Sequence, residues 1–424
     1  MYINVPWDTA TVPLKIDEER LAGVIESKTV KVRDEAAMLR ELLASGTAAP
    51  RLCDFLEGAS GPILVIVNDA TRPTPSGRVI EIMAADLEGR EVEFLVATGS
   101  HKVPGEHELE QIFGRAVRER YLERISSHDA KNDAELVHLG QTSRGVPVWI
   151  NRRVAEARDL LLINSVEPHY FAGYTGGRKS LFPGVAGYAT IEGNHKLALD
   201  PAADNLALEG NPVHEDLAEM IGFLSDKRMY SIQIVLDHQH HIHSAHVGDL
   251  ETSWRSAVHH ADDHYVVDLP ERYDIVVAAA PYPMDYDLYQ SQKALENGSL
   301  AMKDGGILIL VSKCRHGIGA ETFFRLMASA ATPDEVLASI SERYVLGYHK
   351  AARLAHIAKR GEMWGVTGLP DEDLEAAFIR PFASVQAAVD TALARKGPKA
   401  QVLFLMDASI TVPRVAAEQA PRVG

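Results

Sequence analysis

The sequence predicts an α/β fold made of two α/β domains whose sheets are mainly parallel. Three strand–loop–helix units in the first half of the chain support this prediction. Each opens with a short apolar run suited to a strand that is buried on both faces of a sheet; the runs are 63–68, 91–97 and 159–164. Polar loops follow all three runs, and helical patterns follow the first two, at 76–87 and from Glu106.

The second half of the chain repeats this alternation of strands and helices. Three further apolar runs predict strands; they are 274–280, 305–311 and 401–406. Helices are expected at 288–298 and over most of 334–360. These elements are enough for a second α/β domain.

A domain boundary is expected near 268–273, where Leu-Pro-Glu-Arg-Tyr precedes a new buried strand. We therefore predict an N-terminal α/β domain over 1–270 and a C-terminal α/β domain over 271–399. Residues 1–50 are expected to form a short strand or loop followed by a helix near 34–44, and this stretch carries no chemical signal.

The composition indicates a globular enzyme. Apolar residues make up 46% and charged residues 24% of the chain, and the formal charge of −16 offers no basic face for nucleic acid or an anionic membrane. Cys53 and Cys314 stand too far apart to form a metal-binding pair and are too few for a disulfide framework. No apolar run approaches the ~18 residues that span a bilayer. We expect a cytoplasmic protein with neither nucleic-acid nor membrane partners.

Candidate chemistry lies in the loops after the first three strands. The loop after 63–68 carries Asp69 and Arg72, and the loop after 91–97 carries His101. Because open parallel sheets bind ligands beyond the carboxyl ends of their strands, we expect these loops to meet at one active site.

The third loop, Glu167 to Gly184, is the richest in functional residue types. Gly176 and Gly177 have no Cβ and can bring amide groups close to an anion, while Arg178 and Lys179 supply positive charge. The spacing is not that of a P-loop, so the sequence is compatible both with a phosphate cradle and with an ordinary basic loop. Further on, His195 stands in a helical pattern from which an imidazole could reach the same pocket.

Four motifs resemble those of the nickel-dependent lactate racemase family. They occur in the family's order and spacing, and the resemblance covers most of the chain: DATRPTP at 69–75, ATGSH at 97–101, EPHYFAGYTGGRK at 167–179 and GNH at 193–195.

The resemblance implies two cofactor components, nickel and a nickel-pincer nucleotide (pyridinium-3-thioamide-5-thiocarboxylic acid mononucleotide). It makes Lys179 the covalent attachment point, His195 the metal ligand, and His101 and His169 the acid/base pair. The other site residues are assigned to binding, with Asp69, Arg72, Gly176 and Gly177 at the cofactor and Arg72, Gln290 and Lys293 at the substrate. The resemblance also implies an active site in the cleft between the domains, the first of which binds the cofactor, and a tail, 400–424, that returns to that first domain.

The chemistry of the residue types agrees with these assignments. Removing the α-proton of a 2-hydroxy acid is difficult, whereas hydride removal leaves a 2-keto acid if a base takes the hydroxyl proton. Racemisation needs such a base for each enantiomer, and histidine has a suitable pKa near neutrality. The predicted function is therefore racemisation or epimerisation of lactate or a related 2-hydroxy acid. Expected partners are this substrate and the enzymes that synthesise the cofactor. The sequence leaves open whether the protein forms a homo-oligomer.

Two alternatives remain at this stage. One is a phosphate-ligand or nucleotide-binding enzyme that uses the GGRKS loop as an anion cradle, although this leaves the three histidines unexplained. The other is a non-catalytic protein that binds nickel or a nucleotide, although no principal catalytic residue is missing.

Some positions depart from the family pattern and bear on the substrate. Ala280 to Asp285 replaces a common Gly-Gly-Pro-x-Asp loop, and His316-Gly317 replaces a common Glu-Gly. The family's pocket tryptophan has no clear counterpart, because Trp364 is late in the chain and His349 is the alternative.

A histidine-rich stretch, 238–246, suggests a metal site at first sight. The flanking runs 232–236 and 242–247 instead favour an antiparallel hairpin with alternate histidines facing solvent. His259, His260 and His264 are likewise expected at the surface.

Overall fold

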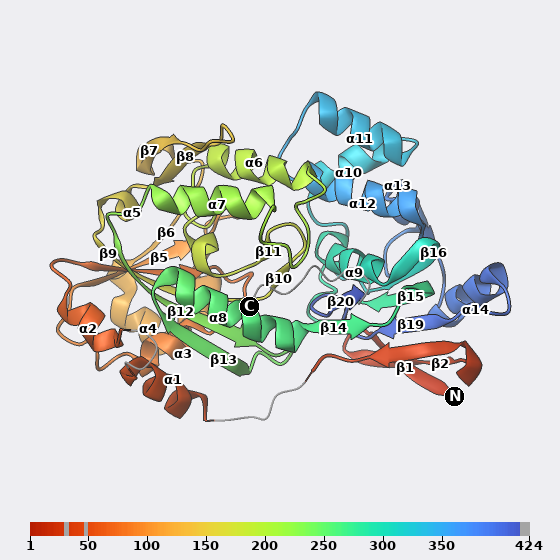
Figure 1. The fold of residues 1–424 in the computed structure, drawn as a ribbon, viewed down its shortest axis with the longest axis horizontal. Coiled ribbons are helices and arrows are strands. Elements are labelled where there is room, and N and C mark those ends of the chain that lie inside the picture. The colour runs from red at the N-terminus through yellow and green to blue at the C-terminus, as the bar shows by residue number, and fades with distance from the viewer. Residues whose placement is uncertain (29–33, 46–49, 416–424) are drawn as a thin grey trace. The chain divides into compact units, whose positions relative to one another are not determined.

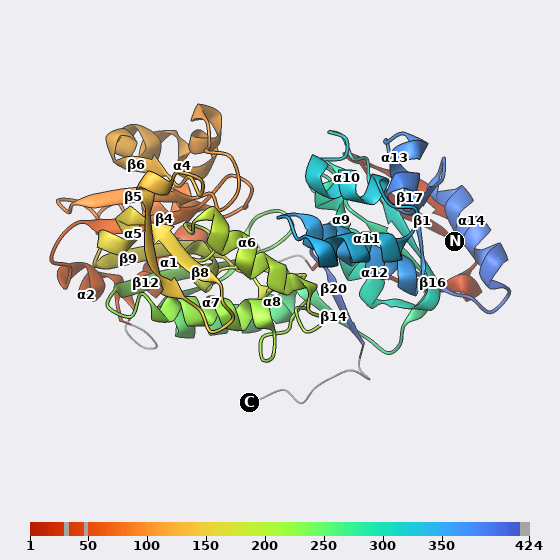
Figure 2. The ribbon, with the colours of Figure 1, turned by 90° about the horizontal axis from the view of Figure 1, so that it is seen from above.

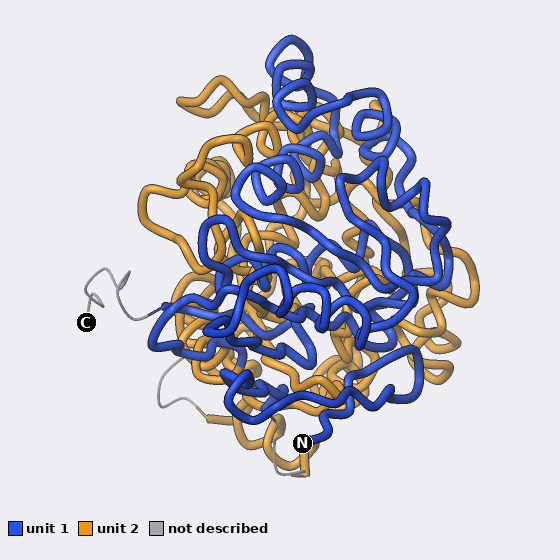
Figure 3. Tube along the Cα trace, turned by 90° about the vertical axis from the view of Figure 1, so that its right-hand side faces the viewer, with its two compact units in different colours: residues 1–28, 265–424 blue, residues 29–264 orange. Residues whose placement is uncertain are grey.

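The computed structural model describes residues 1–28, 34–45 and 50–415. The chain forms two compact units (Figure 3). Unit 1 comprises 1–28 and 265–424, and unit 2 comprises 29–264. Unit 2 is thus inserted in the sequence of unit 1.

Unit 2 is built on a six-stranded sheet with the order β13-β12-β9-β4-β5-β6 (Figure 1). All neighbouring strands are parallel except β12 and β13, which form an antiparallel hairpin. The strands are β4 (Ile63–Asn68), β5 (Val92–Ala97), β6 (Ile125–Ser127), β9 (Asp159–Ser165), β12 (Arg228–Leu236) and β13 (Ile242–Gly248). This topology confirms the three expected strand–loop–helix units and the expected hairpin around the histidine-rich stretch.

One face of this sheet packs against the first four helices of unit 2. Alternate strand residues such as Val65, Phe94 and Leu161 form a core with apolar side chains of these helices. The helices are α1 (Glu35–Ala44), α2 (Leu52–Glu57), α3 (Ser76–Ile82) and α4 (Glu106–Tyr121). Helix α3 is shorter than the expected 76–87, because the chain tightens after Ile82 into turns such as the bond from Ala84 N–H to Glu81 O.

The remaining elements of unit 2 follow α4. They include a small hairpin, β7 (Leu136–Gln141) with β8 (Pro147–Asn151), and a two-residue pair, β10 (Pro168–His169) with β11 (Gly173–Tyr174). The α-helices are α5 (Arg152–Glu156), α6 (Tyr188–Lys196), α7 (Pro212–Gly222) and α8 (Leu250–Tyr265), and the 3-10 turns are η2 (Leu122–Arg124), η3 (Asp133–Glu135), η4 (Gly177–Ser180) and η5 (Leu197–Leu199).

Unit 1 contains a six-stranded, fully parallel sheet with the order β18-β17-β16-β15-β19-β3. Its strands are β3 (Leu21–Ile25), β15 (Tyr273–Ala279), β16 (Met302–Val311), β17 (Glu362–Val366), β18 (Ile379–Pro381) and β19 (Val402–Leu405). Strand β14 (Val266–Leu269) pairs with β20 (Val412–Val415) outside this sheet.

The sheet of unit 1 is covered on both faces. Figure 2 shows α9 (Leu288–Leu300) and α12 (Tyr348–Arg360) on one side and α14 (Val385–Lys396) on the other. The side of α14 also holds a hairpin, β1 (Tyr2–Trp7) with β2 (Ala10–Lys15), whose apolar residues join the same core. The described part of unit 1 also contains the 3-10 turn η1 (Glu18–Arg20) and the helices α10 (Glu321–Ala328), α11 (Pro333–Glu342) and α13 (Asp371–Ala376).

The fold class is the expected one, with two α/β units and mainly parallel sheets. The chain passes from unit 2 to unit 1 after His264, close to the boundary expected near 268–273. The expected N-terminal domain began at residue 1, whereas residues 1–28 belong to unit 1, because β3 pairs with β19. The described part of the expected returning tail also lies in unit 1, and residues 416–424 fall outside the described residues.

None of the helices in the described ranges is both long and apolar enough to cross a membrane.

Candidate active site

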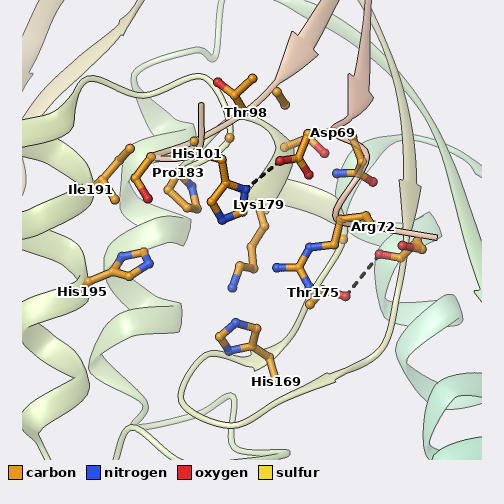
Figure 4. A pocket seen from close by; sticks show the side chains of 18 residues that line it. Asp69, Arg72, Thr98, His101, His169, Thr175, Lys179, Pro183, Ile191 and His195 are labelled. Atoms are coloured by element: carbon orange, nitrogen blue, oxygen red, sulfur yellow. Dashed lines mark hydrogen bonds and ion pairs between the residues drawn. The ribbon is translucent and has the colours of Figure 1, made fainter. Parts of the chain in front are cut away.

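Seven of the predicted residues line one pocket at the carboxyl end of the unit 2 sheet (Figure 4). The loops after β4, β5 and β9 supply most of its wall, and α6 supplies the rest. The seven are Asp69, Arg72, His101, His169, Gly176, Lys179 and His195. The convergence of the three loops follows from the parallel order β9-β4-β5, which brings the three strand ends to one edge.

His101 and Asp69 form a hydrogen-bonded pair across two of these loops. The Nδ1 atom of His101 lies 2.7 Å from Oδ2 of Asp69, and the Thr71 hydroxyl donates to Oδ1 over 2.7 Å. Burial acts to raise the pKa of Asp69, but the bond and charge of His101, with help from Thr71 and Arg72, hold that pKa below its usual value. Because an ionised carboxylate can only accept, the proton of a neutral His101 ring is on Nδ1 and Nε2 is the acceptor.

His169 has the opposite arrangement of ring nitrogens. It is the last residue of β10, and the Ala172 N–H in the turn that follows donates to its Nδ1 over 3.3 Å. A neutral His169 ring then carries its proton on Nε2. The ring stacks on Tyr170 and meets the edge of Phe171, with centroid separations of 4.9 and 4.5 Å.

Arg72 forms an ion pair with Glu167 within unit 2. Its Nη1 atom lies 3.1 Å from Oε1 of Glu167. The backbone of Glu167 is held on both sides by Thr175, whose hydroxyl accepts from Glu167 N–H at 2.9 Å and whose N–H donates to Glu167 O at 2.8 Å. Sequence reasoning did not single out Glu167, because 95 positions separate it from Arg72.

The Lys179 side chain reaches the middle of the pocket, where it ends between His195, His169 and Arg72 (Figure 4). Its backbone belongs to η4, which begins after Gly176 at φ 73°. Gly184 N–H donates to Lys179 O over 3.0 Å and closes the turn. The Lys179 ammonium also lies 5.5 Å from the Phe171 ring centroid.

The other two residues of the GGRK motif face the protein interior. The amide of Gly177 donates to Oε1 of Gln233 over 2.9 Å, and Gly177 is not among the pocket-lining residues. The Arg178 guanidinium, expected to supply charge to an anion, is buried 4.3 Å from the Trp254 ring centroid. Its nitrogens lie 2.9 Å from a ring nitrogen of His214 and 3.0 Å from Glu251.

These contacts clamp the loop onto the helices α7 and α8. Trp254 adds a bond from its indole N–H to Thr175 O, at 2.8 Å. The loop thus presents Lys179 to the pocket from a fixed base.

His195 projects from α6 into the pocket as a neutral imidazole. Burial, followed by the charge of Lys179, lowers the pKa of His195 to about 3. A neutral ring nitrogen is the form that binds metals such as nickel. Within the described ranges, no group of three or more His, Cys, Asp or Glu side chains is placed to hold a metal ion.

Two family models match this chain. Residues 7–205 match the lactate racemase N-terminal domain, and residues 270–412 match the lactate racemase C-terminal domain. The chain belongs to the lactate racemase family.

Individual lactate racemases match over most of their length. The enzyme of Thermoanaerobacterium thermosaccharolyticum is 29% identical over 350 residues, which cover 80% of this chain and 81% of that protein. The enzyme of Lactiplantibacillus plantarum is 29% identical over 424 residues, which cover 96% of this chain and 98% of that protein.

Two solved structures resemble the structure of this chain. The structure of the lactate racemase apoprotein of T. thermosaccharolyticum matches with a TM-score of 0.90 at 27% identity. The match covers 98% of this chain and 100% of that protein's chain. A protein from Thermotoga maritima shares the fold alone, with a TM-score of 0.70 at 15% identity and 91% of this chain covered.

Other residues predicted from the lactate racemase resemblance lie in unit 1. Gln290 and Lys293 are half-buried on α9, whose N-terminus is capped by Asp287 through a 2.7 Å bond from Gln290 N–H. Trp364 is fully buried in β17 against Phe382, so it is a core residue of the unit 1 sheet. His349 is buried at the start of α12, where its Nδ1 lies 3.0 Å from the Tyr344 hydroxyl.

The expectation that His264 lies at the surface is wrong. The last turn of α8 packs on β13, so His264 is buried and stacks on His243 with a centroid separation of 4.6 Å. His246 and His260 form a similar pair at 4.5 Å.

Proposed function

We propose that this protein is a cytoplasmic racemase or epimerase of lactate or a related 2-hydroxy acid that works with a nickel-pincer nucleotide tethered to Lys179. The observation that carries the proposal is the pocket itself, in which a lysine amine, a neutral histidine and two further histidines with opposite proton placement converge. Membership of the lactate racemase family supports it independently.

The residues present fit such a cofactor. The Lys179 amine lies inside the pocket, where it can be acylated, and Gly176 and Gly184 lie beside it without side chains. A Cβ on Gly184 would lie 2.3 Å from the Ser180 carbonyl oxygen, so only glycine fits where this segment packs on the turn that carries Lys179. His195 would supply one nitrogen donor for nickel, and the sulfur groups of the nucleotide would supply soft donors that nickel accepts. When bound, the cofactor would take up and return the hydride of the substrate.

The protein's own groups would handle the substrate's proton and carboxylate. His101, with Nε2 as acceptor, would take the hydroxyl proton of one enantiomer. His169, with its proton on Nε2, would return a proton to form the other enantiomer, and the roles would exchange in the reverse direction. Arg72, oriented by Glu167, would bind the substrate carboxylate. Gln290 and Lys293 are proposed as further substrate contacts from α9.

The arrangement of the GGRK loop does not favour a phosphate cradle. The Gly177 amide and the Arg178 guanidinium already have partners inside unit 2. Asp69 and Gly176 stay as proposed cofactor contacts, and Gly177 would act on the cofactor only through the shape of the loop.

The test is peptide mass spectrometry with nickel analysis on protein co-expressed with the enzymes that synthesise the cofactor. We expect a mass adduct on the peptide containing Lys179 that disappears in Lys179→Ala. In His195→Ala we expect the adduct to persist while nickel is lost. Chiral chromatography of 2-hydroxy acids then identifies the substrate. If a control lactate racemase from the same cells is modified and this protein is not, the proposal is wrong. An adduct without racemisation of any 2-hydroxy acid would indicate a binding protein.

A further inference from the structure

His128 is a fully buried residue just beyond β6 that no step of the proposed reaction uses. Its backbone is tied to the end of the neighbouring strand β5. His128 N–H donates to Val96 O over 3.0 Å, and its carbonyl accepts from the Thr98 hydroxyl over 2.7 Å. Thr98 begins the loop that carries His101, and its carbonyl accepts from His101 N–H at 3.0 Å.

The side chain of His128 belongs to a hydrogen-bond chain whose direction is fixed at both ends. Arg153 N–H donates to Asn151 Oδ1 over 3.0 Å, so the Asn151 amide nitrogen faces His128 Nδ1 at 3.1 Å. At the other end, His128 Nε2 lies 2.9 Å from Ala186 O. A carbonyl oxygen only accepts, so Nε2 carries the proton and Nδ1 accepts from Asn151.

If His128 were protonated, its Nδ1–H and the Asn151 amide N–H, both hydrogen-bond donors, would face each other with no acceptor between them. Burial lowers the pKa of His128, despite the bond to Ala186 and nearby carboxylates, and so keeps the ring neutral. The ring is therefore held in one tautomer and one orientation.

The segment that His128 holds joins two parts of the candidate site. Three consecutive carbonyls, those of Gly184, Val185 and Ala186, accept from three different places: Gly99 N–H at 2.8 Å, Asn151 N–H at 2.9 Å and His128 Nε2–H at 2.9 Å. This segment follows the turn of Lys179 and precedes α6, which carries His195. His128 does not line the pocket.

We propose that His128 is a positioning residue that fixes the loop of His101 against the segment between Lys179 and His195. Its backbone holds the first and its side chain holds the second, so one buried residue sets the spacing across the pocket. The catalytic part of this inference rests on the proposed function, whereas the positional part concerns the protein alone. A displacement of about 1 Å at a reacting group can lower a rate by about 10²-fold.

The positional part is tested by hydrogen exchange on the protein without cofactor. In His128→Phe, which keeps a ring but loses both polar atoms, we expect the Gly99 amide to exchange at least about tenfold faster, because its acceptor segment is released. Phe113→Leu, a core variant of unit 2 away from the pocket, controls for general loss of stability. The exchange rate of the Gly99 amide is compared in the two variants under conditions where their melting temperatures are equal. If the rate is the same in both, the inference is overturned.

The catalytic part is tested on cofactor-loaded protein. We expect His128→Phe to keep the Lys179 adduct and to lower kcat by about 10- to 100-fold with KM changed less than about threefold. His128→Gln, whose amide can still donate to Ala186 O, should recover part of the loss. A wild-type kcat in His128→Phe would overturn this part.

Two further outcomes separate the inferences. If wild-type protein carries no adduct and shows no racemisation, the proposed function fails, and the exchange experiment still decides the position of His128. If His128→Phe does not fold, Asn151→Ala removes the donor to Nδ1 with His128 in place and should show the same rise in Gly99 exchange; unchanged exchange would count against the inference.

Discussion

The Nδ1 atom of His101 and the Oδ2 atom of Asp69 are 2.7 Å apart, although 32 positions separate the two residues in the sequence. They follow β5 and β4, which are adjacent and parallel, so their loops start side by side. About half of the His101 side chain is exposed, at 52%, whereas Asp69 is only 9% exposed. The carboxylate thus orients an imidazole whose other nitrogen faces the pocket.

Replacing Asp69 tests this orientation. In Asp69→Asn, the amide no longer demands a proton on Nδ1, so His101 loses its single tautomer. We expect kcat of the loaded enzyme to fall by about 10²- to 10⁴-fold, the range of general acid–base catalysis. Thr71→Val removes only the hydroxyl on the far oxygen of Asp69 and should cost less than about tenfold. Equal losses in the two variants would contradict the orienting role.

Gly177 tests the packing of the lysine loop. It has φ 52°, and a Cβ there would lie 2.6 Å from the Trp254 ring. Gly210 has φ 75° and open space around it, so Gly210→Ala carries the backbone strain without the clash. We expect Gly177→Ala to lower the free energy of unfolding by about 1–3 kcal/mol more than Gly210→Ala does. Denaturant unfolding measures both, and a smaller loss in Gly177→Ala would refute the predicted clash.

The indole N–H of Trp254 provides a milder test of the same loop. Trp254→Phe keeps an aromatic ring under Arg178 but leaves Thr175 O without its donor. We expect a loss of about 1–3 kcal/mol in the free energy of unfolding. Trp149 has no indole hydrogen bond within the described residues, and Trp149→Phe should cost about 0.5 kcal/mol or less. Thermal unfolding of the two variants makes the comparison.

Acid should destabilise the protein through His214. Burial, then the charges of Arg178 and Arg255, lower the pKa of His214 to about 3. The unfolded chain, with a histidine pKa of about 6.5, binds the proton more readily, so this contribution to stability is complete above pH ~6.5 and is lost as the pH falls toward 3.

The slope from one such histidine is about 1.4 kcal/mol per pH unit. The free energy of unfolding in urea, measured for wild type and His214→Gln at pH 7, 6 and 5, separates the contribution of His214 from that of other groups. Wild type should lose stability more steeply than the variant between pH 6 and 5. Parallel pH curves would show that His214 is not the source.

The strands, the polar loops and most of the pocket follow from local sequence pattern. Runs such as 63–68 and 159–164 identify buried strands, and the rule that ligands lie beyond strand carboxyl ends brings Asp69, His101 and Lys179 together. Those residues are close because β9, β4 and β5 are neighbours, and strands of successive strand–helix units commonly lie side by side.

The remaining contacts depend on strand order and helix packing, which local pattern does not encode. Gln233 holds Gly177 because β12 lies beside β9, and His214 meets Arg178 only after α7 has folded back over the loop. The place of β3 beside β19 is equally hidden, since nearly the whole chain separates them. The buried position of His264 needs the packing of α8 on β13.

The place of β19 between β3 and β15 has a consequence for how the chain is made. On the ribosome, β3 emerges early and all of unit 2 is translated before β19 appears. Unit 2 can therefore complete its own sheet while β3 still waits for its neighbour. A premature stop before residue 402 would leave all of unit 2 in the chain but would remove β19, the only neighbour that β3 has in its sheet among the described residues.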